Sequence, residues 1–314
     1  MRSRFHSDRQ LTVRMTVTLF LLGLLYVAFV AALVVLLKSW VLVVVVAAGL
    51  LIAQYWFSDR IALWAMHGRI VEREEYPQLH GVVDRLCAVA DMPKPLVAVS
   101  DVDMPNAFAT GRNPDHAVLC VTTGLLRRLE ADELEGVLAH ELSHVAHKDV
   151  AVITVASFLG VLAGLIVRFA FYSQLFGARG RKDQNTVAIF VAVMAVSAAV
   201  YAISFVLIRA LSRYRELAAD RSAALLTGRP SALASALTKV TGEIGRIPTR
   251  DLRTAQAFNA FYFTPALGRE PGIANLFSTH PSLEQRLEQL ARISVELGGP
   301  AAPDPITRTP GEAV

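Results

Sequence analysis

The sequence has little charge and few cysteines. Asp, Glu, Lys and Arg make up 18% of its 314 residues, whereas hydrophobic residues make up 54%, above the roughly 45–50% of soluble proteins. The basic residues do not form a stripe with interleaved aromatic residues, which argues against a nucleic-acid partner. The two cysteines, Cys87 and Cys120, lie outside any CxxC motif, so we expect reduced, buried thiols rather than a disulfide.

Charge is absent from four long hydrophobic blocks, residues 15–37, 41–57, 150–167 and 186–208. A helix that crosses a bilayer needs about 20 apolar residues, with a range of about 17–25. All four blocks meet this requirement. We therefore expect a multi-pass integral membrane protein with one N-terminal and one internal helical hairpin.

The first block has an alternative interpretation as a cleaved signal peptide. However, its 23 uncharged residues exceed the apolar core of a usual signal peptide, which has about 7–15 residues. A second block also follows after only three residues, 38–40. A retained hairpin is therefore the better interpretation.

The distribution of basic residues predicts the orientation, because Lys and Arg collect on the cytoplasmic side of a membrane. Four arginines precede the first block and three lie at 60–73 after the second, whereas Lys38 is the one charge between them. This pattern places both flanks in the cytoplasm. The connection at 168–185, however, carries four basic residues, which disfavours its export across the membrane. The sequence therefore does not decide whether the second hairpin crosses the bilayer or only dips into it.

The first polar stretch has the pattern of a helix followed by short strands. Residues 75–92 carry apolar side chains at helical spacing. The runs rich in Val and Leu at 95–101 and 116–126 are typical of strands. Residues 105–115 between them indicate a strand that leads into a hairpin.

The remaining polar segments are predicted to be helical. One helix begins near Asp132, which forms a capping-box pattern with Glu135. Three more helices are expected within 209–228, 231–244 and 278–297, the last with a proline in its first turn.

The stretch HELSH places two histidines on one face of the helix that begins near Asp132. His140 and His144 are four residues apart, so both imidazoles can reach one metal ion. Glu141 lies about 100° further around the helix, where a carboxylate can take a proton from water. The alternative is a histidine-rich helix end without a function. The apolar neighbours of the motif argue against that, because buried His and Glu side chains need partners, and imidazoles suit zinc.

A catalytic zinc site has three protein ligands and one open position. The stretch RELAAD places Glu216 and Asp220 on one helical face. Glu216 can be the third ligand, and Asp220 can accept a hydrogen bond from the far nitrogen of a ligating histidine. The alternative is an exposed face on which both carboxylates pair with neighbouring arginines. His147, three residues after His144, is left without an assigned role.

HELSH, SRYRELAAD and the order of the hydrophobic blocks resemble the HtpX-type membrane zinc endopeptidases, relatives of the eukaryotic CAAX prenyl endopeptidases. The resemblance covers nearly the whole chain. It implies one Zn²⁺ per chain, held by His140, His144 and Glu216, with Glu141 as the general base. It also implies a mainly α, multi-helix integral membrane protein with a zincin-like α+β metallopeptidase domain that contains a small β-sheet.

Two further segments match this family. Asn106, Ala107 and Phe108 match a substrate-binding edge strand, which can hold an extended peptide by backbone hydrogen bonds. The stretch THPSLEQR makes His280 and Arg286 candidates for oxyanion stabilisation or support of the cleft. The chain is too short for the seven-helix chamber of the prenyl endopeptidases, so a prenylated substrate is not expected.

We therefore divide the chain into five parts. Residues 58–149 and 209–296 are the two halves of one catalytic domain, which together have enough residues for one core. Residues 1–57 form a transmembrane hairpin, and 150–208 form a second, fully or partly inserted one. The tail at 297–314, rich in Pro and Gly, is expected to be disordered.

The expected function is zinc-dependent hydrolysis of misfolded or surplus membrane proteins, as protein quality control at the cytoplasmic face of a bacterial plasma membrane. The partners are the lipid bilayer and membrane-protein or unfolded polypeptide substrates, while the oligomeric state is not readable. The alternative is a non-catalytic membrane scaffold or sensor with a structural zinc. A structural site normally has a fourth protein ligand; the sequence offers no obvious Cys for it, and Glu141 would then have no task.

Overall fold

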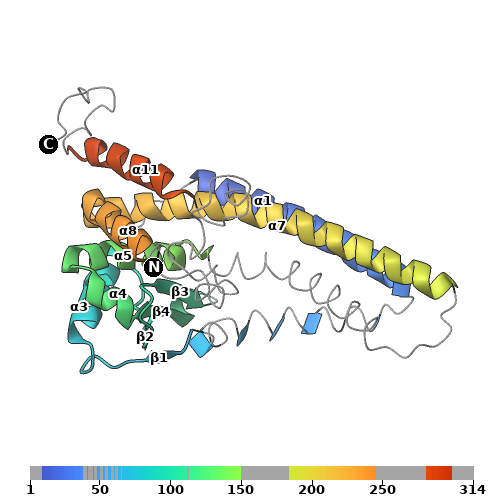
Figure 1. Cartoon of the computed structure of the whole chain (residues 1–314), viewed down its shortest axis with the longest axis horizontal. Coiled ribbons are helices and arrows are strands. Elements are labelled where there is room, and N and C mark those ends of the chain that lie inside the picture. The colour runs from blue at the N-terminus through green and yellow to red at the C-terminus, as the bar shows by residue number, and fades with distance from the viewer. Residues whose placement is uncertain are drawn as a thin grey trace.

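The structure, a computed structural model, combines a compact α/β part with two long helices, α1 (Arg9–Leu37) and α7 (Gln184–Thr227), which extend from it side by side (Figure 1). The architecture is mainly helical with a small mixed sheet, as the sequence predicts. The described residues are 9–37, 66–111, 113–149, 184–244 and 281–298, with scattered helical positions between 41 and 64.

The sheet has four described strands, one more than predicted. They are β1 (Gly68–Ile70), β2 (Leu96–Ser100), β3 (Ala107–Gly111) and β4 (Ala117–Thr122), in the order β1-β2-β4-β3. β2 and β4 are parallel, and the two outer pairs are antiparallel. β1 escapes prediction because three residues cannot show an alternating pattern. All six residues of β4 are buried, as expected for a strand covered on both faces, and β3 lies at the edge of the described sheet.

The strand predicted at 116–126 is shorter than expected. β4 ends at Thr122, whose hydroxyl accepts a hydrogen bond from a backbone N–H in the first turn of α4 (Thr123–Arg128). This cap starts a helix where the run of apolar residues suggested more strand. His116 belongs to the single-turn 3₁₀ helix η1 (Pro114–His116), which connects β3 to β4.

The helix that carries HELSH is α5 (Ala131–Ala146), and it packs on β3 and β4. The predicted capping box of Asp132 and Glu135 is wrong. Glu130 and Glu133 form the box instead, each accepting a hydrogen bond from a backbone N–H at the other residue. Asp132 forms an ion pair at the surface, so its carboxylate is used elsewhere.

The hydrophobic core lies between the sheet, α5 and α8 (Pro230–Ile244). Gly136 of α5 permits a close approach of these two helices, since a Cβ atom there would lie 3.3 Å from backbone atoms of Leu233. α3 (Pro77–Ala90) packs on α5, and the thiols of two free, buried cysteines lie in this same core.

The C-terminal helix α11 (Leu283–Glu296) packs on α7 and α8. Its capping box is formed by Ser282 and Gln285. Pro281 therefore precedes the N-cap, and the prediction of a proline in the first turn is wrong. The position before an N-cap also tolerates proline, because no helical hydrogen bond requires its missing N–H.

The long helices α1 and α7 are antiparallel. Gln10 at the start of α1 accepts a hydrogen bond from Tyr214 near the end of α7, and a separate apolar cluster joins the two helices. α7 is one continuous helix of 44 residues, whereas the sequence suggested an apolar block followed by a separate helix. The buried residues of this cluster are Leu22, Phe29, Leu33, Val193 and Val200.

Two described helices are long and apolar enough to cross a membrane, by length and composition alone. They contain the segments Gln10–Val35 and Val191–Thr227, with mean hydropathy 2.7 and 2.5. These correspond to the first and fourth predicted blocks. The second predicted block is described only at scattered helical positions, and the third, 150–167, lies outside the described residues.

Candidate metal centre

α5 presents three chemically active side chains from two successive turns. His140 and His144 lie one turn apart on the same face, with their rings edge to face and the ring centroids 4.9 Å apart. Both imidazoles are buried, as is the carboxylate of Glu141. The helix therefore holds two nitrogens and one carboxylate out of solvent, as the HELSH spacing predicts.

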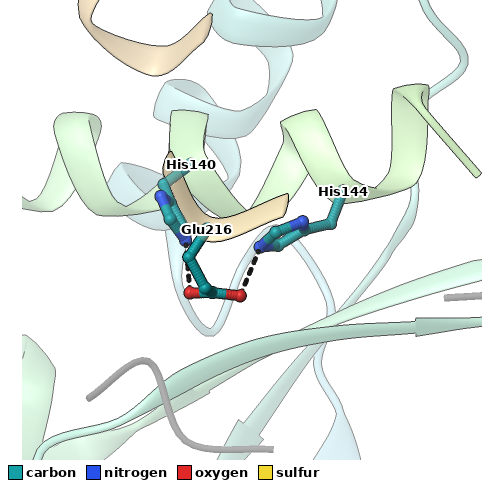
Figure 2. A group of neighbouring side chains, drawn as sticks. All are labelled: His140, His144 and Glu216. Carbon is teal, nitrogen blue, oxygen red and sulfur yellow. Dashed lines mark ion pairs between the residues drawn. The ribbon is translucent and has the colours of Figure 1, made fainter. Parts of the chain in front are cut away.

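Glu216 reaches the two histidines from α7. Its Oε2 atom lies 3.5 Å from Nε2 of His140, and its Oε1 atom lies 3.6 Å from Nε2 of His144. Figure 2 shows the carboxylate facing both imidazoles, with one oxygen toward each. The alternative interpretation of an exposed, salt-bridged face is wrong, because the side chain of Glu216 is only 6% exposed.

This arrangement fits a metal ion. Ligand atoms about 2.0–2.2 Å from a tetrahedral ion lie about 3.3–3.6 Å apart, which matches both contacts between His and Glu216. One ligand atom from each of His140, His144 and Glu216 lies within 4.8 Å of the others. Two imidazoles and one carboxylate are also the ligand types that divalent transition metals take in catalytic sites.

A buried carboxylate supports the outer nitrogen of His140. Nδ1 of this histidine lies 2.9 Å from Oδ1 of Asp220, which is one helical turn beyond Glu216 on α7. Asp220 in turn accepts two hydrogen bonds from Arg286 of α11, at 2.7 and 2.6 Å. Such a partner favours the tautomer in which Nε2 carries the free lone pair. Arg286 thus contacts the carboxylate that lies behind His140. The sequence had left two roles open for Arg286, oxyanion stabilisation and support of the cleft.

His144 has a matching partner that the sequence did not identify. Its Nδ1 atom lies 2.9 Å from Oδ2 of Asp149, and the same oxygen lies 3.2 Å from Nε of Arg215. The spacing of five residues between His144 and Asp149 gives no helical signal. α5 ends at Ala146, and Lys148 then adopts a left-handed conformation with φ 59°, which turns the chain back toward the histidine.

Glu141 contacts the neighbouring edge strand. Its Oε2 atom accepts a hydrogen bond of 3.1 Å from the backbone N–H of Ala109 in β3. Burial raises the pKa of Glu141 to about 7. A carboxyl group with a pKa near neutrality can both accept and return a proton.

The two histidines differ electrostatically. Burial by itself lowers the pKa of His140, but the carboxylates of Asp220 and Glu216 outweigh burial and raise it to about 9. Burial lowers the pKa of His144, and Asp149 only partly opposes this effect. Because a metal binds the neutral imidazole, binding at His140 is expected to release a proton.

The other candidate residues lie in different places. Asn106 precedes β3, and Ala107 and Phe108 are its first residues; all three are buried and belong to the strand whose Ala109 contacts Glu141. His280 lies outside the described residues. The outer atom Nδ1 of His147 lies 2.8 Å from the backbone oxygen of Ser143, so this histidine is bound to its own helix.

Buried His and Glu side chains that could hold a metal ion lie on two helices, beside a small mixed sheet, as in a metallopeptidase-type site. The family model of peptidase family M48 matches residues 73–294 of the chain. The chain therefore belongs to peptidase family M48 and is a metalloprotease.

Curated relatives align with nearly the full length of this chain. "Protease HtpX homolog 1" of Streptomyces coelicolor is 81% identical over 303 residues, which are 96% of this chain and 99% of the relative. "Protease HtpX homolog" of Moorella thermoacetica is 51% identical over 299 residues, 95% of this chain and 99% of the relative. Together with the two apolar helices, this kinship supports a membrane-associated metalloprotease.

A solved structure shares the fold. The crystal structure of S. mikatae Ste24p matches with a TM-score of 0.50 and 18% identity, over 90% of this chain and 67% of that one. At this identity the likeness concerns the fold alone.

Proposed function

We propose that the chain is a zinc-dependent endopeptidase that hydrolyses peptide bonds of misfolded or surplus membrane proteins, or of unfolded polypeptides, at the cytoplasmic face of the membrane. One observation carries the proposal: His140, His144 and Glu216 converge with Nε2–Oε contacts of 3.5 and 3.6 Å, and Glu141 is buried beside them. The three converging residues would hold the zinc ion.

The reaction follows from what each side chain does. When bound, zinc supplies Lewis acidity that makes water more acidic and polarises a peptide carbonyl. Glu141 takes the proton from the attacking water and passes it to the leaving amine. The hydrogen bond from Ala109 fixes the orientation of the Glu141 carboxylate, and the pKa of about 7 allows it to perform both proton transfers near neutral pH.

The edge strand offers a place for the substrate backbone. The N–H of Ala109 points away from β4, since it donates to Glu141, and the C=O of the same residue projects from the same side of the strand. An extended peptide that pairs with this edge of β3 would lie next to Glu141. Recognition through the backbone demands little of substrate side chains, as quality control of varied proteins requires.

The continuous helix α7 supports cleavage near the bilayer. Its apolar block ends at Ile208, and Glu216 follows eight residues later on the same helix. At 1.5 Å per residue the ligand lies about 12 Å along the helix from the end of that block. A site at that distance can reach loops of membrane proteins close to the membrane surface.

The test compares Glu141→Gln with the unchanged chain, both full-length in detergent and in lipid vesicles. Cleavage of labelled casein, of a co-reconstituted membrane protein and of the chain itself is measured, together with bound zinc. We expect Glu141→Gln to keep one zinc per chain and to lose at least about 100-fold in rate, as for a general base. Glu135→Gln, on the same helix but ion-paired with Arg85, is the matched control and should retain activity.

Two results would contradict the proposal. Undiminished cleavage by Glu141→Gln would exclude Glu141 as the base. Zinc binding without any cleavage by the unchanged chain would favour the alternative of a non-catalytic scaffold or sensor.

A further inference from the structure

Each histidine of the metal centre is supported by a buried ion pair between an aspartate and an arginine. For His140 the pair consists of Asp220 and Arg286, and both side chains are at most 2% exposed. For His144 it consists of Asp149 and Arg215, whose side chains are 1% and 10% exposed. The second pair follows no sequence pattern, but it repeats the chemistry of the first.

The position of Asp149 depends on how α5 ends. The backbone N–H of His147 donates to Ser143, and that of Lys148 donates to Val145. Lys148 then has φ 59°, so the chain reverses and Asp149 meets the imidazole of the last turn. The helix terminus therefore brings a carboxylate to the side of His144 that faces away from Glu216.

Arg215 connects this carboxylate to α7. It directly precedes Glu216, and its Nε atom lies 3.2 Å from the Asp149 oxygen that also contacts His144. A carboxylate at the outer nitrogen of a ligating imidazole fixes the orientation of the ring and raises its basicity.

We propose that Asp149 is a positioning residue for His144 and that Arg215 acts through Asp149. Two adjacent residues of α7 then have linked tasks: Glu216 is a metal ligand, and Arg215 holds the carboxylate that orients a second ligand, His144. Asp149 holds the Nδ1–H of His144, which leaves the Nε2 lone pair directed at Glu216. The inference rests on the proposed zinc site. It extends that site by two residues outside the proposed set of zinc ligands.

The test measures metal binding, which requires no cleavage. Zinc affinity of the full-length protein in detergent is determined by competition with a chromophoric chelator, and Co²⁺ is used as a spectroscopic probe of ligand geometry. Asp149→Ala should weaken zinc binding about 10–100-fold, as the loss of such outer partners does, and should shift the visible absorption of bound Co²⁺. Asp132→Ala, near the start of α5, removes an exposed partner of Arg229 and should change neither.

A double variant keeps the test decisive if Asp149→Ala, which leaves the Arg215 charge without this partner, folds poorly. Asp149→Ala/Arg215→Met removes both charges. If Arg215 acts only through Asp149, the zinc affinity of the double variant should match that of Asp149→Ala within about 3-fold, as non-additivity requires. Arg215→Met alone should weaken binding less, because Asp149 remains.

The outcomes separate the two proposals. Unchanged zinc affinity and an unchanged Co²⁺ spectrum in the double variant, with normal binding by the unchanged chain, overturn the positioning role of Asp149 and Arg215 but not the proposed function. Absence of zinc binding by the unchanged chain overturns the proposed function, and with it the positioning role of Asp149 and Arg215.

Discussion

The two halves of α7 expose and bury different kinds of side chain. In the apolar half, large side chains face outward: Val191, Ile203 and Val206 are 57%, 48% and 63% exposed, whereas Ser197 and Ser204 are buried. In the polar half the buried side chains include charged ones, Glu216 and Asp220. A single helix thus exposes large apolar side chains along one half and buries charged side chains along the other.

This difference shows what each half is suited to. Small serines at spacings of three and four residues from buried valines let α1 approach closely, and the outward apolar face suits lipid. The buried carboxylates of the other half are tolerated because each has a partner. The four predictions below test the comparison, from the largest expected effect to the smallest.

The polar half should lose its metal when its ligand is neutralised. Glu216→Gln replaces a carboxylate by an amide, a poor metal ligand, so zinc affinity should fall by more than the roughly 10–100-fold that loss of an outer partner costs. Zinc content after dialysis measures this, with the exposed Glu288→Gln of α11 as the control. Stoichiometric zinc in Glu216→Gln would show that the two histidines suffice.

Buried and exposed ion pairs between α7 and α11 should differ in strength. Arg286→Met leaves Asp220 as a buried charge without its bidentate partner, so the free energy of unfolding should fall by about 3–5 kcal/mol. Arg221→Met breaks the exposed pair with Glu296 and should cost at most about 1 kcal/mol. A denaturant titration in mild detergent measures both.

A second variant tests the reason for this difference. Asp220→Asn/Arg286→Met removes both charges and should recover part of the lost stability, since the penalty comes from one uncompensated charge. Equal losses from Arg286→Met and Arg221→Met would contradict the distinction between the pairs.

The apolar half should reject charge where the polar half accepts it. Ala199 and Ala210 are both exposed and lie about three turns apart on the same face. Ala199→Lys should cost about 2.5–3.5 kcal/mol of apparent insertion free energy, as Lys does at the centre of a membrane helix, whereas Ala210→Lys should cost little beside Arg209. The membrane-inserted fraction of the 184–215 segment measures the difference, and equal fractions would argue against insertion of this half.

The smallest effect is expected at the turn that brings Asp149 to Arg215 of the polar half. Lys148 has φ 59°, which costs a residue with a Cβ atom about 1–2 kcal/mol relative to glycine. Lys148→Gly should therefore raise the thermal midpoint slightly, Lys148→Ala should leave it unchanged, and Lys148→Val should lower it. A gain in Lys148→Ala equal to that in Lys148→Gly would identify the lysine charge, not the conformation, as the cause.

Much of the site could be predicted because its parts are local. His140 and His144 share a face since they are four residues apart, and Glu216 and Asp220 share a face for the same reason. The burial of HELSH also follows from its apolar neighbours. The errors occurred where local signals compete: Asp132 resembled a cap but pairs at the surface, and the strand ending at Thr122 gave way to a side-chain cap.

The rest of the site depends on contacts that no spacing shows. Asp149 reaches His144 only because the chain reverses at Lys148. The N–H of Ala109 reaches Glu141 only because β3 packs against α5.

The sequence by itself determined which side chains share a helical face and which segments are apolar, since both depend on residues a few positions apart. The tertiary structure alone decided that α7 continues unbroken from its apolar half into its polar half and crosses α5 at Glu216. It also decided that Arg215 and Arg286 each compensate a buried carboxylate behind one histidine. The physical reason is that helical periodicity orients a side chain on its own helix, whereas its partner is selected by the packing of elements that are distant in the chain.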